Sequence, residues 1–123
     1  MEEAPEPGTE EALERAARVF TDGRERERFN RSDIAARRGA IHRLCDEIKP
    51  RVERQIEPAA LNEAIDGVLA RADGIESESS RAELVANLLL FKAGILNHWG
   101  RLAEIEELAP RFLDSVNAMT DGS

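Results

Sequence analysis

The chain has 123 residues, which is the size of one domain, and it carries one cysteine and a formal net charge of −8. A single cysteine excludes an internal disulfide framework and a zinc site built on several thiolates. The acidic balance argues against general binding to nucleic acid or to anionic membranes, because attraction between basic side chains and phosphate supplies much of that affinity.

Residues 1–8 place Pro5, Pro7 and Gly8 among glutamates, a composition that predicts a disordered acidic tail. The segment has no apolar stretch behind a basic start, so it does not look like a secretory signal. We expect one helical domain over residues 9–119 and a frayed tail over residues 120–123.

The first predicted helix begins after Thr9, a good N-cap residue, and ends near residues 21–23. Residues 24–31 alternate basic and acidic side chains, and they either continue this helix or form an exposed link. A second helix is predicted to begin near Ser32, because apolar residues keep helical spacing from 34 to 56. Pro50 lies inside this run and predicts a kink or a short break.

The third predicted helix begins near Pro58, where the missing proline N–H costs nothing, and ends by Gly74. Ser80 and Glu83 form a capping-box pattern that opens a fourth helix. Gly94 inside that helix predicts a close approach to a neighbouring helix, because glycine costs ~1 kcal/mol relative to alanine there.

The fifth predicted helix covers residues 102–119, with Pro110 expected to bend or split it. Apolar residues in the run 82–99 cover nearly the whole circumference of the fourth helix, which must therefore be enclosed by the other helices or by a second subunit. The run is too short, and too interrupted by polar residues, for a membrane span. No segment has the alternation of a strand. The sequence thus predicts an all-α, single-domain bundle of four to five helices, cytoplasmic, with helix 80–99 at its centre.

Residues with catalytic or metal-binding chemistry are few. The two histidines, His42 and His98, do not form a paired metal-binding motif, and no carboxylate pair lies in an apolar stretch. We therefore expect no metal, no cofactor and no enzymatic activity. His98 and Trp99 suggest either a ligand pocket or a helix-end histidine beside a core tryptophan, and we favour the second interpretation.

The segment Arg37–His42, with four residues between the arginine and the histidine, resembles the Arg-x4–6-His pattern of the HEPN family of helical ribonucleases. The resemblance implies an arginine that holds a phosphate and a histidine that moves a proton. Arg38 occupies the position after the arginine, where that family usually has a polar Asn, Asp or His.

Residues 32–48 also resemble a DNA-binding helix-turn-helix, with the turn at Gly39. In that arrangement four basic side chains would face the nucleic acid. A single continuous helix is the alternative that we favour, since an arginine stands where the motif has an apolar residue. The candidate contacts are Arg37, Arg38, His42 and Arg43.

The function predicted from these features is a small protein–protein interaction module, an accessory or adaptor subunit that self-associates. The apolar helix exceeds what one small bundle needs for its core, and a partner would cover the surplus. Core packing within one chain explains the same spacing equally well. The candidate partner-binding residues follow one line of the helix at i, i+3, i+7 and i+11, namely Leu88, Phe91, Ile95 and Trp99.

Overall fold

The computed structural model describes residues 5–121, and within them every regular element is helical. The predicted all-α class is confirmed, but six α-helices replace the four to five expected. The additional helix is the charge-alternating segment that the sequence left undecided. The elements are α1 (Glu10–Thr21), α2 (Gly23–Arg31), α3 (Ile34–Arg54), α4 (Pro58–Arg71), the 3₁₀ turn η1 (Ala72–Gly74), α5 (Glu78–His98) and α6 (Leu102–Asp121).

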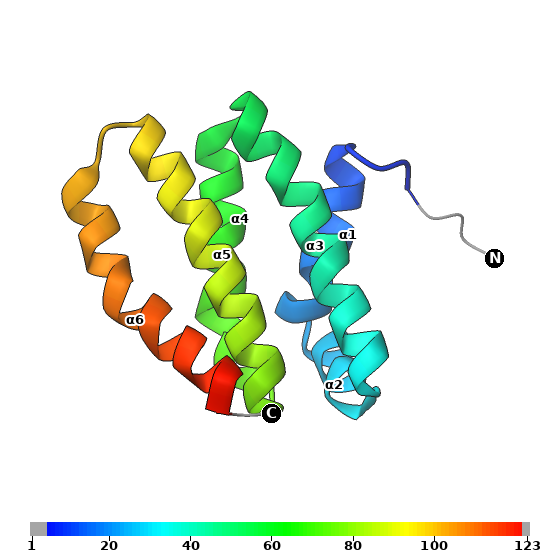
Figure 1. The fold of residues 1–123 in the computed structure, drawn as a ribbon. Helices are drawn as coiled ribbons and strands as arrows, with labels where there is room; N and C mark the ends of the chain where they lie inside the picture. The colour runs from blue at the N-terminus through cyan, green and yellow to red at the C-terminus, as the bar shows by residue number, and fades with distance from the viewer. Residues whose placement is uncertain (1–4, 122–123) are drawn as a thin grey trace.

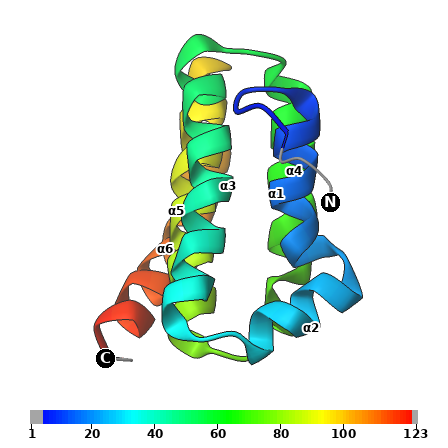
Figure 2. The same ribbon diagram turned by 90° about the vertical axis from the view of Figure 1, so that its right-hand side faces the viewer.

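The helices form two layers. Figure 1 shows α6, α5 and α3 side by side, and Figure 2 shows α1 and α4 as a second layer, with α2 crossing one end of the bundle. Helix α5 contacts α3, α4 and α6, while α6 packs mainly on α5. Helix α5 is thus the middle helix of its layer, and α3 joins that layer to α1, α2 and α4. The predicted tails lie partly outside the described residues, at 1–4 and 122–123, and the backbone of α6 continues to 121.

Side-chain caps explain where the N-terminal helices begin. Thr9 accepts a hydrogen bond from the backbone N–H of Ala12 at 3.1 Å, as predicted. Asp22 adopts extended backbone and accepts from the N–H of Glu25 at 3.0 Å, which ends α1 and starts α2. Phe29 then anchors α2, because it is buried and meets Phe20 edge-on at a centroid distance of 5.2 Å.

The predicted capping box at Ser80 is wrong by one turn. Ser77 caps α5 instead, accepting from the N–H of Ser80 at 3.3 Å. The Ser80 hydroxyl is buried and accepts from Nε of Arg37 at 3.0 Å, which joins α3 to α5. A serine inside the first turn is thus available for a tertiary contact because another serine satisfies the helix end.

Neither internal proline interrupts its helix. Helix α3 runs through Pro50 and α6 runs through Pro110, so the predicted break and split do not occur. Both prolines are exposed. On α3, buried Ile48 and Arg51 hold the chain to the core on either side of the proline.

A buried ion pair ties the start of α1 to α3. Arg51 is 8% exposed, and its Nη1 lies 3.1 Å from Oε1 of Glu47 while Nη2 donates to the carbonyl oxygen of Thr9 at 2.7 Å. The Glu47 carboxylate also accepts from the N–H of Gly8 at 3.0 Å. These contacts satisfy both charges and close one end of the bundle.

Within one chain, the neighbouring helices do not enclose α5 on every side. Leu90 is 56% exposed, and Gly94 and Asn97 on the same side are exposed too. The close approach predicted at Gly94 is present, since a Cβ there would lie 3.1 Å from Cγ1 of Val52 on α3. Helices α3, α4 and α6 cover three sides of α5 and leave this fourth strip open.

Candidate binding face

An exposed apolar surface runs along α5 and α6. Leu90, Leu102 and Leu113 are 56%, 63% and 58% exposed. Leu102 and Leu113 are eleven residues apart, which is three helical turns, so they share one side of α6. We call this surface the leucine face and define it by these three residues.

The leucine face lies on the outer side of the layer formed by α3, α5 and α6. On α5, Lys92 points toward α4, because its Nζ lies 2.7 Å from Oδ1 of Asp66 and 3.1 Å from Oδ1 of Asn62. Leu90 stands two residues earlier, about 200° away around the helix. It therefore points away from α4, which lies behind this layer in Figure 1.

The leucines of α6 point the same way. Arg111 donates from Nη2 to the carbonyl oxygen of Leu69 on α4 at 3.3 Å, and Leu113, two residues later, points about 200° away from Arg111 around the helix. Leu113, and Leu102 on the same side of α6, therefore also point away from α4.

The two helices that flank α5 in this layer carry opposite charge. Among the exposed Lys, Arg, Asp and Glu side chains, those of α3 are four basic and two acidic, whereas those described on α6 are four acidic and one basic. The exposed apolar strip of α5 thus lies between a basic and an acidic helix. The charged side chains counted are Arg38, Arg43, Lys49, Arg54, Asp46 and Glu53 on α3, and Glu104, Glu106, Glu107, Asp114 and Arg111 on α6.

The four residues predicted to bind a partner do not form this face. Leu88 is 0% exposed and Ile95 is 3% exposed, so both belong to the core and offer no surface in this fold. Phe91 and Trp99 are half-buried and pack against the same core. The apolar stripe that predicted partner binding faces the core. A helix that packs against three neighbours buries its most regular apolar stripe.

Sequence reasoning missed the leucine face, although one signal for it was present. Residues 88–90 are three consecutive leucines, and successive residues on a helix point about 100° apart. They cannot all face one core. Leu88 and Leu89 are buried, and Leu90 is the one left outside.

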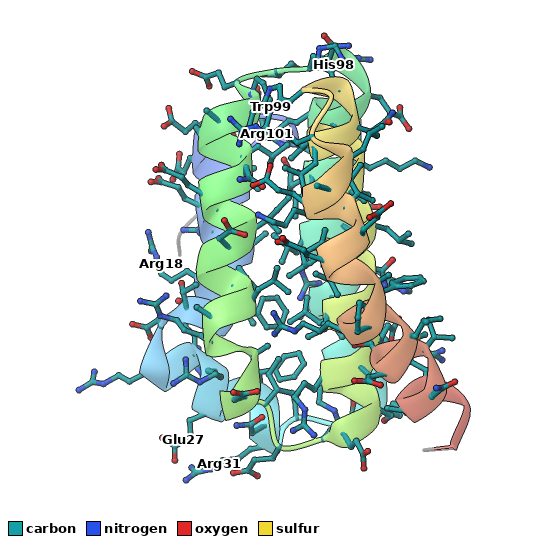
Figure 3. All side chains as sticks on the ribbon, turned by 90° about the vertical axis from the view of Figure 1, so that its left-hand side faces the viewer. Arg18, Glu27, Arg31, His98, Trp99 and Arg101 are labelled. Atoms are coloured by element: carbon teal, nitrogen blue, oxygen red, sulfur yellow. The ribbon has the colours of Figure 1, made fainter. Side chains whose placement is uncertain are left out.

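The end of α5 carries the predicted tryptophan environment. Trp99 is half-buried and Arg101 stacks on it, with the guanidinium carbon 4.9 Å from the ring centroid (Figure 3). His98 is exposed at the same end of the molecule. The arrangement is that of a packed tryptophan beside a helix-end histidine.

The candidate nucleic-acid residues are divided among separate contacts. Arg37 donates from Nε to Ser80 and from Nη1 to the carbonyl oxygen of Ser32. His42 lies 3.4 Å, through Nε2, from Oε1 of Glu83, and Nε of Arg38 lies 3.9 Å from Oε2 of the same carboxylate. These paired side chains do not converge on an open phosphate site, and the fourth candidate, Arg43, is simply exposed.

The helix-turn-helix alternative, with its turn at Gly39, is not formed. Helix α3 continues without a turn from Ile34 to Arg54, so that interpretation of residues 32–48 is wrong and the continuous helix is correct. The HEPN-like pair is also not assembled, because Arg37 and His42 are five residues apart and point about 140° apart around one helix.

The lone cysteine is a neutral thiol. Desolvation by burial, and then the nearby Asp46 and Glu83 carboxylates, raise the pKa of Cys45 from 9.0 to about 11. Thiolate is the nucleophilic form, so this environment opposes thiol catalysis even though His42 and Glu83 are near in the fold.

We expect Cys45 to react slowly with an aromatic disulfide reagent at pH 8, and the unfolded chain to react much faster. Because the pKa is higher in the folded state, the thiol's contribution to stability is complete below pH 9 and is lost as the pH rises toward 11. Urea unfolding at pH 8 and pH 10.5, with Cys45→Ala as the control, measures that loss. Equal reaction rates for folded and unfolded protein would show that the thiol is freely accessible.

Comparisons with protein-family models, with curated proteins and with solved structures give no match. Across residues 5–121, no helix has the length and apolar character needed to cross a membrane. In the same residues, no three His, Cys, Asp or Glu side chains come together as a metal site.

Proposed function

We propose that the protein is a self-associating helical interaction module and that two copies join through the outer side of the α3–α5–α6 layer. The observation that carries the proposal is the leucine face, three leucines each more than half exposed on one side of a well-packed bundle. Large apolar side chains gathered on one face are typical of protein interaction sites.

A two-fold axis parallel to the helices, passing over α5, describes the proposed pairing. Rotation about such an axis stacks α5 of one copy on α5 of the other in a parallel direction, with Leu90 against Leu90. The same rotation places α6 of each copy over α3 of the other. Leu102 and Leu113 are then covered at the two edges of the interface.

Charge favours a second copy as the occupant. The exposed side chains of α6 carry a net negative charge and those of α3 a net positive charge, and the pairing brings these unlike helices together twice. Complementary charge at the rim of an apolar interface selects the partner and its orientation. A pairing that stacked α6 on α6 would oppose two acidic helices.

Sedimentation equilibrium tests the proposal. We expect the wild-type mass to rise from monomer to dimer with concentration. Leu90→Glu and Leu113→Lys should each weaken the dimer at least tenfold, because the first buries an unpaired carboxylate and the second places a cation against the basic α3 of the other copy. Ile56→Glu is the matched control, since Ile56 is 43% exposed but lies in the loop between α3 and α4. A monomer at every concentration, or equal loss in all three variants, would contradict the proposal.

A further inference from the structure

A cavity of about 470 Å³ opens between α1 and α4, and its volume falls within the range of small-molecule sites. Its wall is divided about equally between apolar and polar residues, which come from both helices and from the loop between α3 and α4. Three of the wall residues are alanines, which leave space that longer side chains would fill. The apolar residues are Leu13, Ala17, Ile56, Ala60, Leu61 and Ala64.

One buried cation at the cavity is already neutralised. Arg51 lines the cavity, but its guanidinium pairs with the Glu47 carboxylate at 3.1 Å and donates to the Thr9 carbonyl oxygen at 2.7 Å. Its charge is therefore balanced within the protein. An anionic ligand would have to compete with Glu47 for it.

The rim of the cavity is acidic. Glu10 and Glu14 from α1 and Glu57 from the loop are exposed there, and among residues 5–121 no ion pair joins any of them to a basic side chain. The other basic residue of the lining is Arg18, which Figure 3 shows at the outer edge of the bundle. Because Arg51 is paired with Glu47, the three rim carboxylates outnumber the one remaining cation of the lining, Arg18.

The backbone holds the loop residues at the mouth of the cavity. Gln55 and Glu57 have positive φ angles of 56° and 42°, in a backbone region that residues other than glycine rarely adopt. The reversal brings the chain from the end of α3 directly into Pro58 at the start of α4. Ile56 and Glu57 are thereby fixed beside the apolar wall, one contributing apolar surface and the other charge.

We propose that this cavity binds a small organic cation with an apolar body, of the arylalkylamine or alkylamine class. The apolar group occupies the space beside Ala17, Ala60 and Ala64, and the ammonium group lies among the rim carboxylates. Apolar burial supplies the affinity, and the three carboxylates select the sign of the charge. This site is independent of the leucine face, because the two lie on different helices.

Two probes with one apolar body and opposite charge test the site. In ¹H–¹⁵N spectra of the full chain, we expect 2-phenylethylamine to shift amide signals of residues 13–21 and 56–64, and 3-phenylpropionate to leave them unchanged. Equal shifts with both probes, shifts scattered over the whole surface, or no shifts at millimolar concentration would overturn the proposal.

Variants separate charge selection from apolar burial. Glu14→Gln and Glu57→Gln should each weaken 2-phenylethylamine binding about two- to fivefold, the range of one exposed charge contact. Glu63→Gln on α4 is the matched control, because Glu63 is exposed and does not line the cavity. Ala17→Leu should abolish binding by filling the space, and Ala60→Leu provides a second filling variant if the first unfolds. Unchanged binding in both filled variants would contradict the assignment.

Discussion

Leu88→Ala is expected to lower the free energy of unfolding by about 3 kcal/mol, and Leu90→Ala to change it by less than about 0.5 kcal/mol at monomer concentrations. Both residues are leucines of α5, but Leu88 is 0% exposed and Leu90 is 56% exposed. The first truncation leaves a cavity between α5 and its neighbours, whereas the second removes a side chain that water already surrounds.

Urea unfolding of dilute protein, followed by circular dichroism, measures both values. The comparison controls for helix propensity, because both variants make the same change in the same helix. Equal losses of unfolding free energy would mean that Leu90 belongs to the core and is not part of an exposed leucine face.

Arg51→Met is expected to lower the free energy of unfolding by about 3 kcal/mol, because it leaves the half-buried Glu47 carboxylate without its cation. The substitution also removes the hydrogen bond to the Thr9 carbonyl oxygen, which holds the start of α1 against α3. Arg54→Met, an exposed arginine on the same helix, should cost less than about 0.5 kcal/mol.

The double variant Arg51→Met/Glu47→Met isolates the charge effect. It should be more stable than Arg51→Met alone, since no unpaired carboxylate remains near the core. Thermal and urea unfolding of the four proteins give the coupling between the two side chains. A double variant less stable than the arginine variant would show that Glu47 stabilises the bundle mainly through another contact.

Local signals predicted most helix boundaries. Thr9, Pro58 and Gly74 act on the chain within a few residues of themselves, and the structure places helix ends beside each of them. Helix α2 could not be assigned because its only buried apolar residue is Phe29, and a single apolar residue cannot define a helical period. The start of α5 was misplaced because Ser77 and Ser80 are equally good caps in isolation.

The binding face could not be predicted in the same way. Which side of α5 remains open depends on where α3, α4 and α6 pack, and these contacts join residues far apart in the chain. The stripe from Leu88 to Trp99 was visible in the sequence, but periodicity does not distinguish a core from a docking surface. The acidic rim around the α1–α4 cavity likewise depends on the loop after α3, which brings Glu57 beside α1 residues.

The α3–α5–α6 pairing is tested most directly by disulfide formation at position 90. In a Cys45→Ala background, Leu90→Cys should cross-link rapidly to a dimer under mild oxidation, because a two-fold axis over α5 brings the two copies of residue 90 together. Ile56→Cys in the same background should remain largely monomeric. Cross-linking at equal rates from positions 90 and 56, or none from position 90 at concentrations where the wild-type protein is dimeric, would contradict the account.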